Sequence, residues 1–181
     1  MSTPAIPQPV KLIMSLITGM PHLIDAVCET LRAYFGELDF ISDLLPFHYT
    51  RYYEAELGSS LVRRMISFQT LISPDALPAI KLTTNSLEQR FADTSGKRRV
   101  NIDPGYIALS HVILATGKGF AHRPYLRDGI YADLTLIFQA HTFRPLEWTF
   151  PDYRSEEMIG LLNTLRSQYL KQLRGTAGKG A

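Results

Sequence analysis

Two glutamates at alternate positions are the first candidates for chemistry in this 181-residue sequence. Glu54 and Glu56 lie in the stretch YYEAEL (52–57), which we predict to be a strand. Side chains alternate along a strand with a period of two, so both carboxylates would project from one face. Such a pair can hold Mg²⁺ or Mn²⁺ against a phosphate chain, with Glu54 and Glu56 as catalytic and metal-ligating residues. The alternative is structural, with cross-strand ion pairs to Arg63 and Arg64.

A second group of polar residues lies between residues 97 and 140, where the sequence indicates neighbouring strands. Arginine suits bidentate binding of phosphate or carboxylate groups, and Arg123 can approach Asp133 and Tyr131 on a shared polar face. The candidate ligand-binding residues are Arg99, Asn101, Asp103, Lys118, His122, Arg123, Tyr131 and Asp133. The alternative is a solvated sheet face held together by ion pairs.

The stretch ATGKGFAHR (115–123) has the composition of a phosphate-binding loop but not its spacing. A Walker loop requires GxxxxGK[ST] between a strand and a helix. Here a glycine follows the lysine, Val112 occupies the place of the first glycine, and the flanking residues are typical of strands. We therefore interpret residues 117–119 as a hairpin turn that delivers Arg123 to the next strand.

Three aromatic residues near the end of the chain add a further candidate surface. Trp148, Phe150 and Tyr153 lie in the proline-broken stretch HTFRPLEWTFPDYR (141–154). Aromatic side chains can stack a nucleobase, and they can equally seal the edge of a core.

The hydrophobic pattern predicts strands near the start of the chain and again between residues 97 and 140. Residues 10–18 form a nearly continuous apolar run, typical of a strand covered on both faces. Residues 97–140 predict an antiparallel meander of three or four strands. In its last strand five apolar residues are predicted to face one way: Ile130, Ala132, Leu134, Leu136 and Phe138.

Helices are predicted in three places. Apolar residues recur at helical spacing from Ile24 to Phe35, next to Gly36. Residues 73–92 have helical content that Pro78 and residues 83–85 divide, and Asn85 with Glu88 predicts a new helix start. Ser155 is expected to cap a final helix whose buried stripe is Met158, Leu162, Leu165 and Tyr169.

Together these segments predict an α+β fold with a mostly antiparallel sheet backed by two or three helices. The stretch LDFISDLLPF (38–47) predicts a further strand that Pro46 stops. The opening strand–helix–strand suggests a ferredoxin-like element that a C-terminal β-meander extends, and a partly closed β-barrel is the alternative. We expect a single domain over residues 10–174. A flexible arm with three prolines (1–9) would precede it and a disordered tail (175–181) would follow it.

Composition restricts the cellular setting and the partners. A net charge of +2 is too small to indicate nucleic acid. Cys28 is the single cysteine, so no intrachain disulfide can form, and a reducing compartment is favoured. The apolar run at 12–17 is too short to cross a bilayer, and the N-terminus lacks the charged region of a secretory signal. We expect a cytoplasmic protein without a membrane partner.

Six blocks of sequence, within residues 10–173, carry a family resemblance: YYEAELG, IKLTTNSLE, RRVNIDPGYI, ILATGKGFAHRPYL, GIYADLTL and WTFPDYR. They resemble an uncharacterised bacterial domain-of-unknown-function family whose members often carry the label GTP-binding protein. The resemblance implies a nucleotide ligand without implying any established chemistry. Because the sequence has no GTPase motif, such a nucleotide site would be unconventional.

Three functions remain open from these residues. The first is binding of a phosphorylated small molecule or nucleotide by the basic and polar sheet face. The second is metal-dependent phosphohydrolysis, using Glu54, Glu56, Asp103 and Asp133 with Mg²⁺ or Mn²⁺. The third is a non-catalytic module for protein interaction.

Overall fold

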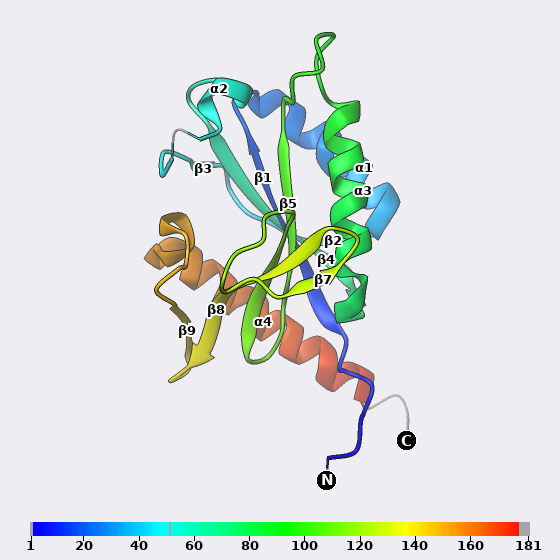
Figure 1. The fold of residues 1–181 in the computed structure, drawn as a ribbon. Coiled ribbons are helices and arrows are strands. Elements are labelled where there is room, and N and C mark those ends of the chain that lie inside the picture. The colour runs from blue at the N-terminus through cyan, green and yellow to red at the C-terminus, as the bar shows by residue number, and fades with distance from the viewer. Residues whose placement is uncertain (1, 51, 178–181) are drawn as a thin grey trace.

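The computed structural model describes residues 2–50 and 52–177, which form a nine-stranded sheet with helices on both faces (Figure 1). The strands are β1 (Val10–Thr18), β2 (Leu38–Ile41), β3 (Leu45–Pro46), β4 (Val62–Ile72), β5 (Asn101–Ile107), β6 (His111–Thr116), β7 (Tyr125–Arg127), β8 (Ile130–Gln139) and β9 (Thr142–Pro145). The α-helices are α1 (Ile24–Phe35), α2 (Glu54–Leu57), α3 (Leu77–Arg90) and α4 (Glu156–Ala177). Three short 3₁₀ helices are η1 (Pro21–Leu23), η2 (Pro74–Ala76) and η3 (Pro151–Arg154).

Four strands and two helices form the predicted ferredoxin-like element. Along the chain they run β1–α1–β2–β4–α3–β5, and in the sheet the order is β2–β4–β1–β5. This order places β4 between β1 and β2, which is the split βαβ arrangement. The strands β6, β8 and β7 extend the sheet beyond β5, and all pairs are antiparallel. The predicted α+β class is confirmed. Because the sheet is open, ending at β2 and β7, the alternative of a partly closed barrel is wrong.

One face of the sheet is covered by α1 and α3 (Figure 1). Leu12, Met14 and Leu16 of β1 form a cluster there with apolar residues of both helices, including Leu31 and Leu87. The next residues along β1 point to the opposite face, where Ile13 joins a second cluster. All nine residues of β1 are buried, which explains the continuous apolar run of its sequence.

The opposite face is covered by α4. Its predicted stripe of Met158, Leu162, Leu165 and Tyr169 is buried. The Met158 amide donates to Ser155 Oγ at 3.2 Å, so the predicted cap is also confirmed. The helix continues to Ala177, three residues beyond the predicted end of the domain at residue 174. Met1 and the rest of the predicted tail, residues 178–181, lie outside the described residues. No helix in the described part of the chain is long and apolar enough to cross a membrane.

The helix α3 is continuous, so the predicted division near Asn85 is wrong. Pro78 lies in the first turn, where its missing N–H leaves no hydrogen bond unmade. Glu88 does not cap a helix start, because its carboxylate accepts the Ile102 amide at 2.6 Å.

A bulge in β8 corrects the predicted alternation of that strand. Val112 pairs with Leu136 and Ile113 pairs with Leu134, so Thr135 is the extra residue. Leu134 therefore packs on the α3 side with Ile113, whereas Leu136 packs on the α4 side. The five apolar residues do not share one face. The bulge lies two residues beyond Asp133, a buried carboxylate discussed below.

The strands β5 and β6 pair along only part of their length. Asn101 already pairs with β1, but pairing with β6 begins at Gly105. A Cβ atom on Gly105 would lie 2.4 Å from the Ile113 carbonyl oxygen, which is inside any permitted contact. The absence of a side chain at Gly105 therefore allows the two strands to approach where their pairing starts.

We expect Gly105→Ala to lower the free energy of unfolding by about 1–3 kcal/mol, because the backbone must move to relieve that contact. Urea denaturation measures the change. The matched control is Gly160→Ala in α4, where nothing lies within 4 Å of the new Cβ. The control should raise stability by roughly 0.5–1 kcal/mol through helix propensity. Equal stability of the two variants would contradict the close contact at Gly105.

Candidate functional site

The loop at residues 117–124 connects β6 to β7 without forming a hairpin. The strand β8 pairs with β6 on one side and with β7 on the other. The chain must therefore pass from one side of β8 to the other between Thr116 and Tyr125. The predicted hairpin turn at 117–119 is wrong, because β6 and β7 are not neighbours in the sheet. Consequently His122 and Arg123 lie in this loop rather than in the next strand.

The predicted contact between Arg123 and Asp133 is confirmed. Arg123 Nε donates to Asp133 Oδ2 at 2.7 Å, and Arg123 Nη1 donates to the Lys118 carbonyl oxygen at 3.2 Å. Asp133 is only 2% exposed, and a buried carboxylate requires a partner to offset its lost hydration. His122 Nε2 lies 3.6 Å from the same carboxylate. Asp133 thus anchors the loop from beneath.

Aromatic rings surround this anchored loop. The ring of His122 stacks on Trp148 with centroids 4.9 Å apart and an interplanar angle of 13°, and Phe120 contacts His122 edge-on. The Trp148 indole donates to the Leu134 carbonyl at 2.8 Å. The guanidinium of Arg123 lies 5.7 Å from the ring centroid of Phe150.

These rings are accessible to solvent. Phe120 is 68% exposed, Trp148 39% and Phe150 43%. Tyr153, the third predicted stacking residue, is 3% exposed and packs in the α4-side core. Of the three aromatic residues singled out in the sequence, Trp148 and Phe150 can therefore meet a ligand, and Tyr153 seals the core.

Lys118 extends the same surface toward a distant segment of the chain. Its Nζ donates to the Tyr52 hydroxyl at 2.9 Å and lies 4.3 Å from the centroid of that ring. Within residues 2–50 and 52–177, no carboxylate lies within ion-pair distance of Lys118. Tyr131 lies under the loop, since a Cβ on Gly119 would be 3.1 Å from its ring. We name as the loop patch the residues Tyr52, Lys118, Phe120, His122, Arg123, Trp148 and Phe150.

Glu54 and Glu56 do not form a pair of carboxylates on a strand. They lie in the four-residue helix α2, where residues two apart point in different directions. Glu54 is exposed. Glu56 is bound by Arg98 through Nε at 2.6 Å and Nη2 at 2.5 Å, and this hydrogen bonding lowers the pKa of its carboxyl. The strand prediction for these residues is wrong.

The structural alternative for the two glutamates is also wrong. Arg63 forms a buried ion pair with Asp152, and Arg64 lies 3.8 Å from Asp25. Neither arginine forms an ion pair with Glu54 or Glu56 of α2.

Asn101 and Asp103 belong to a polar network that joins β5 to α3. Asn101 Nδ2 donates to Asp103 Oδ2 at 2.6 Å, and Lys81 Nζ lies 3.2 Å from Asp103 Oδ1. Arg98 Nη1 donates to Asn101 Oδ1 at 3.2 Å and to Glu88 at 2.8 Å. Burial raises the pKa of the Glu88 carboxyl despite these cations. Because each member is held by another, this network has the character of a structural support.

Arg99 lies apart from both groups, with its Nε 3.3 Å from Met20 Sδ. The structure therefore brings together Lys118, His122, Arg123, Tyr131 and Asp133. Among the described residues, no hydrogen bond or ion pair joins this group to Arg99, Asn101 or Asp103. Within the described ranges, no group of three or more His, Cys, Asp or Glu residues could hold a metal ion.

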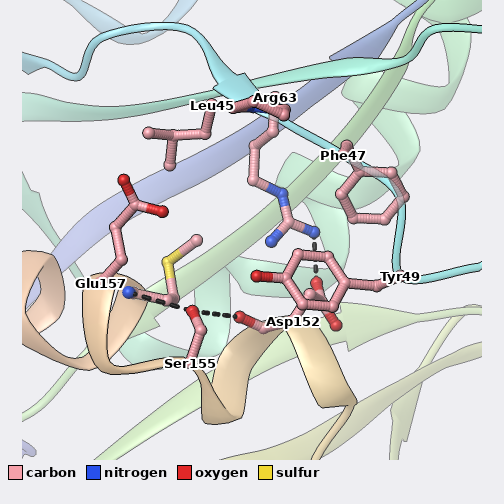
Figure 2. Close-up of a pocket in the computed structure, with 9 residues that line it drawn as sticks. Leu45, Phe47, Tyr49, Arg63, Asp152, Ser155 and Glu157 are labelled. Atoms are coloured by element: carbon pink, nitrogen blue, oxygen red, sulfur yellow. Dashed lines mark hydrogen bonds and ion pairs between the residues drawn. The ribbon is translucent and has the colours of Figure 1, made fainter.

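Arg63 and Asp152 line a small cavity at the start of α4. Figure 2 shows the guanidinium of Arg63 reaching Asp152, with Ser155 and Glu157 across the cavity. Its volume is about 10 Å³, the size of one water molecule. A cavity of this size excludes a nucleotide.

Two residues of the loop patch were missed in the sequence. Phe120 lies inside the quoted stretch ATGKGFAHR, where its nearness to His122 was an available signal. Tyr52 precedes Lys118 by 66 positions, so only the fold reveals their contact.

Comparison with known families identifies a match over most of the chain. A sequence model of a domain of unknown function, DUF4416, matches residues 8–169. The chain belongs to this family. The DUF4416 match covers the sheet and most of α4, as the resemblance in the sequence predicted, and the family description states no activity. No curated protein and no solved structure matches this DUF4416 chain.

Two tyrosines of this DUF4416 protein have raised pKa values, from which we expect a loss of folding stability at alkaline pH. Burial, followed by the negative charge of Asp103, raises the pKa of Tyr53, and burial likewise raises the pKa of Tyr153. A pKa raised by folding gives stability that is fully present below the unfolded value of about 10 and is lost as pH rises above it. We expect Tyr153→Phe to flatten this loss between about pH 9 and pH 11, as measured by urea unfolding at each pH.

The control is Tyr125→Phe, because Tyr125 is 60% exposed. It should retain the parent's alkaline profile. The Tyr153 hydroxyl has no hydrogen bond of good geometry within the described residues, so its removal should leave the fold intact at neutral pH. An unchanged alkaline profile in Tyr153→Phe would contradict the assignment.

Proposed function

We propose that the loop patch binds a nucleotide or another phosphorylated small molecule. The main support for this proposal is Lys118, an exposed cation that the ring and the hydroxyl of Tyr52 hold in place. In the described part of the chain, Lys118 has no carboxylate partner. A phosphate group can therefore approach Lys118 without displacing an ion pair. The Tyr52 contact also reduces the side-chain entropy that Lys118 loses on binding.

The aromatic residues supply the second half of such a site. Trp148 is held by its hydrogen bond to Leu134 and by its stack on His122, so its orientation is set before a ligand arrives. Stacking of a base on an aromatic ring contributes about 1–3 kcal/mol per base. Phe120 and Phe150 present further exposed rings on the same patch.

Arg123 acts in this proposal chiefly as a positioning residue. Its charge is compensated by Asp133, and its Nη1 holds the backbone of Lys118. The arginine therefore fixes the loop that presents Lys118 and His122. It contributes less net attraction for phosphate than an unpaired arginine would.

Binding without hydrolysis is the form of the hypothesis that the geometry favours. Three of the four carboxylates considered for hydrolysis have cationic partners: Glu56 with Arg98, Asp103 with Lys81, and Asp133 with Arg123. The fourth, Glu54, is exposed on α2. In the part of the chain that the structure describes, metal-dependent hydrolysis thus has no assembled set of carboxylates to support it.

We expect ATP and GTP to change the fluorescence of Trp148, which is the single tryptophan, and to release measurable heat in calorimetry. Lys118→Ala should weaken binding by roughly threefold to tenfold, the range for loss of one solvent-exposed charged contact. Comparison with adenosine and guanosine separates the contribution of phosphate from that of the base.

The matched control is Lys171→Ala, which removes an exposed lysine from α4. It should bind the nucleotides like the parent. If Lys118→Ala and Lys171→Ala bind ATP and GTP with equal affinity, the loop patch is not the phosphate site. The absence of any fluorescence change or heat at millimolar ATP and GTP would overturn nucleotide binding altogether.

A further inference from the structure

The strand β2 leaves one edge of the sheet unpaired, on the side opposite to β7. It pairs with β4 and is the last strand of the sheet in that direction among the described residues. Ser42 still donates its amide to the Met65 carbonyl oxygen of β4 at 2.9 Å, and residues 43 and 44 then interrupt the pairing before β3 resumes it. An unpaired edge presents backbone N–H and C=O groups that another extended chain can use.

A groove follows this edge on the α4 side of the sheet. Its volume is about 340 Å³, within the roughly 300–1,000 Å³ of typical ligand sites. The lining residues are Phe40, Ile41, Ser42, Asp43, Leu45, Glu157, Leu161 and Thr164. The lining therefore includes four apolar residues, of which Phe40, Leu45 and Leu161 pack on the α4 side, and two residues with carboxylates.

The two carboxylates give the groove a defined charge. Asp43 and Glu157 are exposed, and no cation lies within ion-pair distance of either one in residues 2–50 and 52–177. Glu157 also borders the small Arg63 cavity, where Figure 2 shows its carboxylate on the side near Leu45. Unpaired negative charge beside apolar surface favours a ligand that is both cationic and apolar.

We propose that this groove binds a short extended segment of a partner protein, with a lysine or arginine two residues from an aliphatic residue. The segment adds to the free edge of β2 as a further strand. In an added strand, alternate side chains point to the same face, so a basic and an aliphatic residue at i and i+2 both enter the groove. The basic residue meets Asp43 or Glu157, and the aliphatic residue meets Leu45 and Leu161.

The dimensions of the groove set the length of the segment. Glu157 and Thr164 line it from α4, and seven helical steps between them span about 10 Å. An extended chain rises about 3.3 Å per residue, so about three residues fill this length. A basic–x–aliphatic triplet has that length. This inference is independent of the loop patch, because the two surfaces share no residue.

The test uses a fluorescein-labelled peptide, TKTVTKT, in polarisation titrations of the full chain. The peptide places its lysines and valine on one face of a strand. We expect binding that weakens with salt, because exposed charge pairs are screened by ions. The charge-reversed peptide TETVTET should bind at least tenfold more weakly. Two further peptides, N-methylated at alternate sets of backbone amides, separate strand addition from side-chain docking, and one of the two should lose binding.

Matched variants locate the site. Asp43→Asn combined with Glu157→Gln should weaken binding by roughly threefold to thirtyfold, whereas Glu156→Gln, one position away and exposed, should not. Thr164→Trp should block the groove, and Ser167→Trp on the same helix should not. Circular dichroism establishes that each variant is folded.

The proposal is overturned if TKTVTKT does not bind at millimolar protein, or if TETVTET binds equally well. Equal binding by both N-methylated peptides would also overturn it, because strand addition requires those amides. A concentration-dependent dimer that Thr164→Trp dissociates would assign the groove to a second copy of the chain instead.

Discussion

The central strand β1 buries all nine of its residues, and this constraint determines the layers of the molecule. A strand with apolar side chains on both faces needs cover on both faces. The helices α1 and α3 supply it on one side and α4 on the other, each through its own apolar cluster. The candidate surfaces lie away from this central strand, at the β6–β7 loop and at the β2 edge.

Buried charges connect this core to its loops. Lys11 is fully buried in β1 and binds Asp39 of β2, Arg63 of β4 binds Asp152 of η3, and Asp133 of β8 binds Arg123. Removing one partner of such a pair costs more than the pair itself contributes, because the remaining charge stays buried. These pairs therefore bind particular segments to particular strands. The Arg123 pair is the one that sets the position of the loop patch.

The two candidate surfaces differ in charge and in the way they are built. The loop patch joins three segments of the chain, and its cation Lys118 contacts the exposed ring of Tyr52. The β2 groove has unpaired carboxylates beside an open strand edge. A phosphate group and a basic peptide would therefore discriminate between them by electrostatics alone. Under the two proposals, the loop patch would take the anion and the β2 groove the cationic partner.

Local patterns were sufficient for much of the fold. Continuous apolar residues identified β1, and the 3.6-residue period with a serine cap identified α4. The same rules failed where tertiary contacts override them. Thr84 is buried with its hydroxyl bonded to the Lys81 carbonyl, so α3 continues through a polar triplet. The Thr135 bulge reverses the faces of β8, and nothing in the alternation of that strand reveals it.

The sequence by itself determined the α+β class, the ferredoxin-like element, the family and the contact between Arg123 and Asp133. These features depend on periodicity and on residues close in the chain. Only the tertiary structure decided that Glu56 is held by Arg98, that Lys118 meets Tyr52, and that β2 has a free edge. The first two contacts join residues that lie 42 and 66 positions apart in the chain, and the free edge depends on no other segment pairing with β2 among the described residues. Strand order is set by the packing of the whole sheet between its helices, and no local run of residues encodes it.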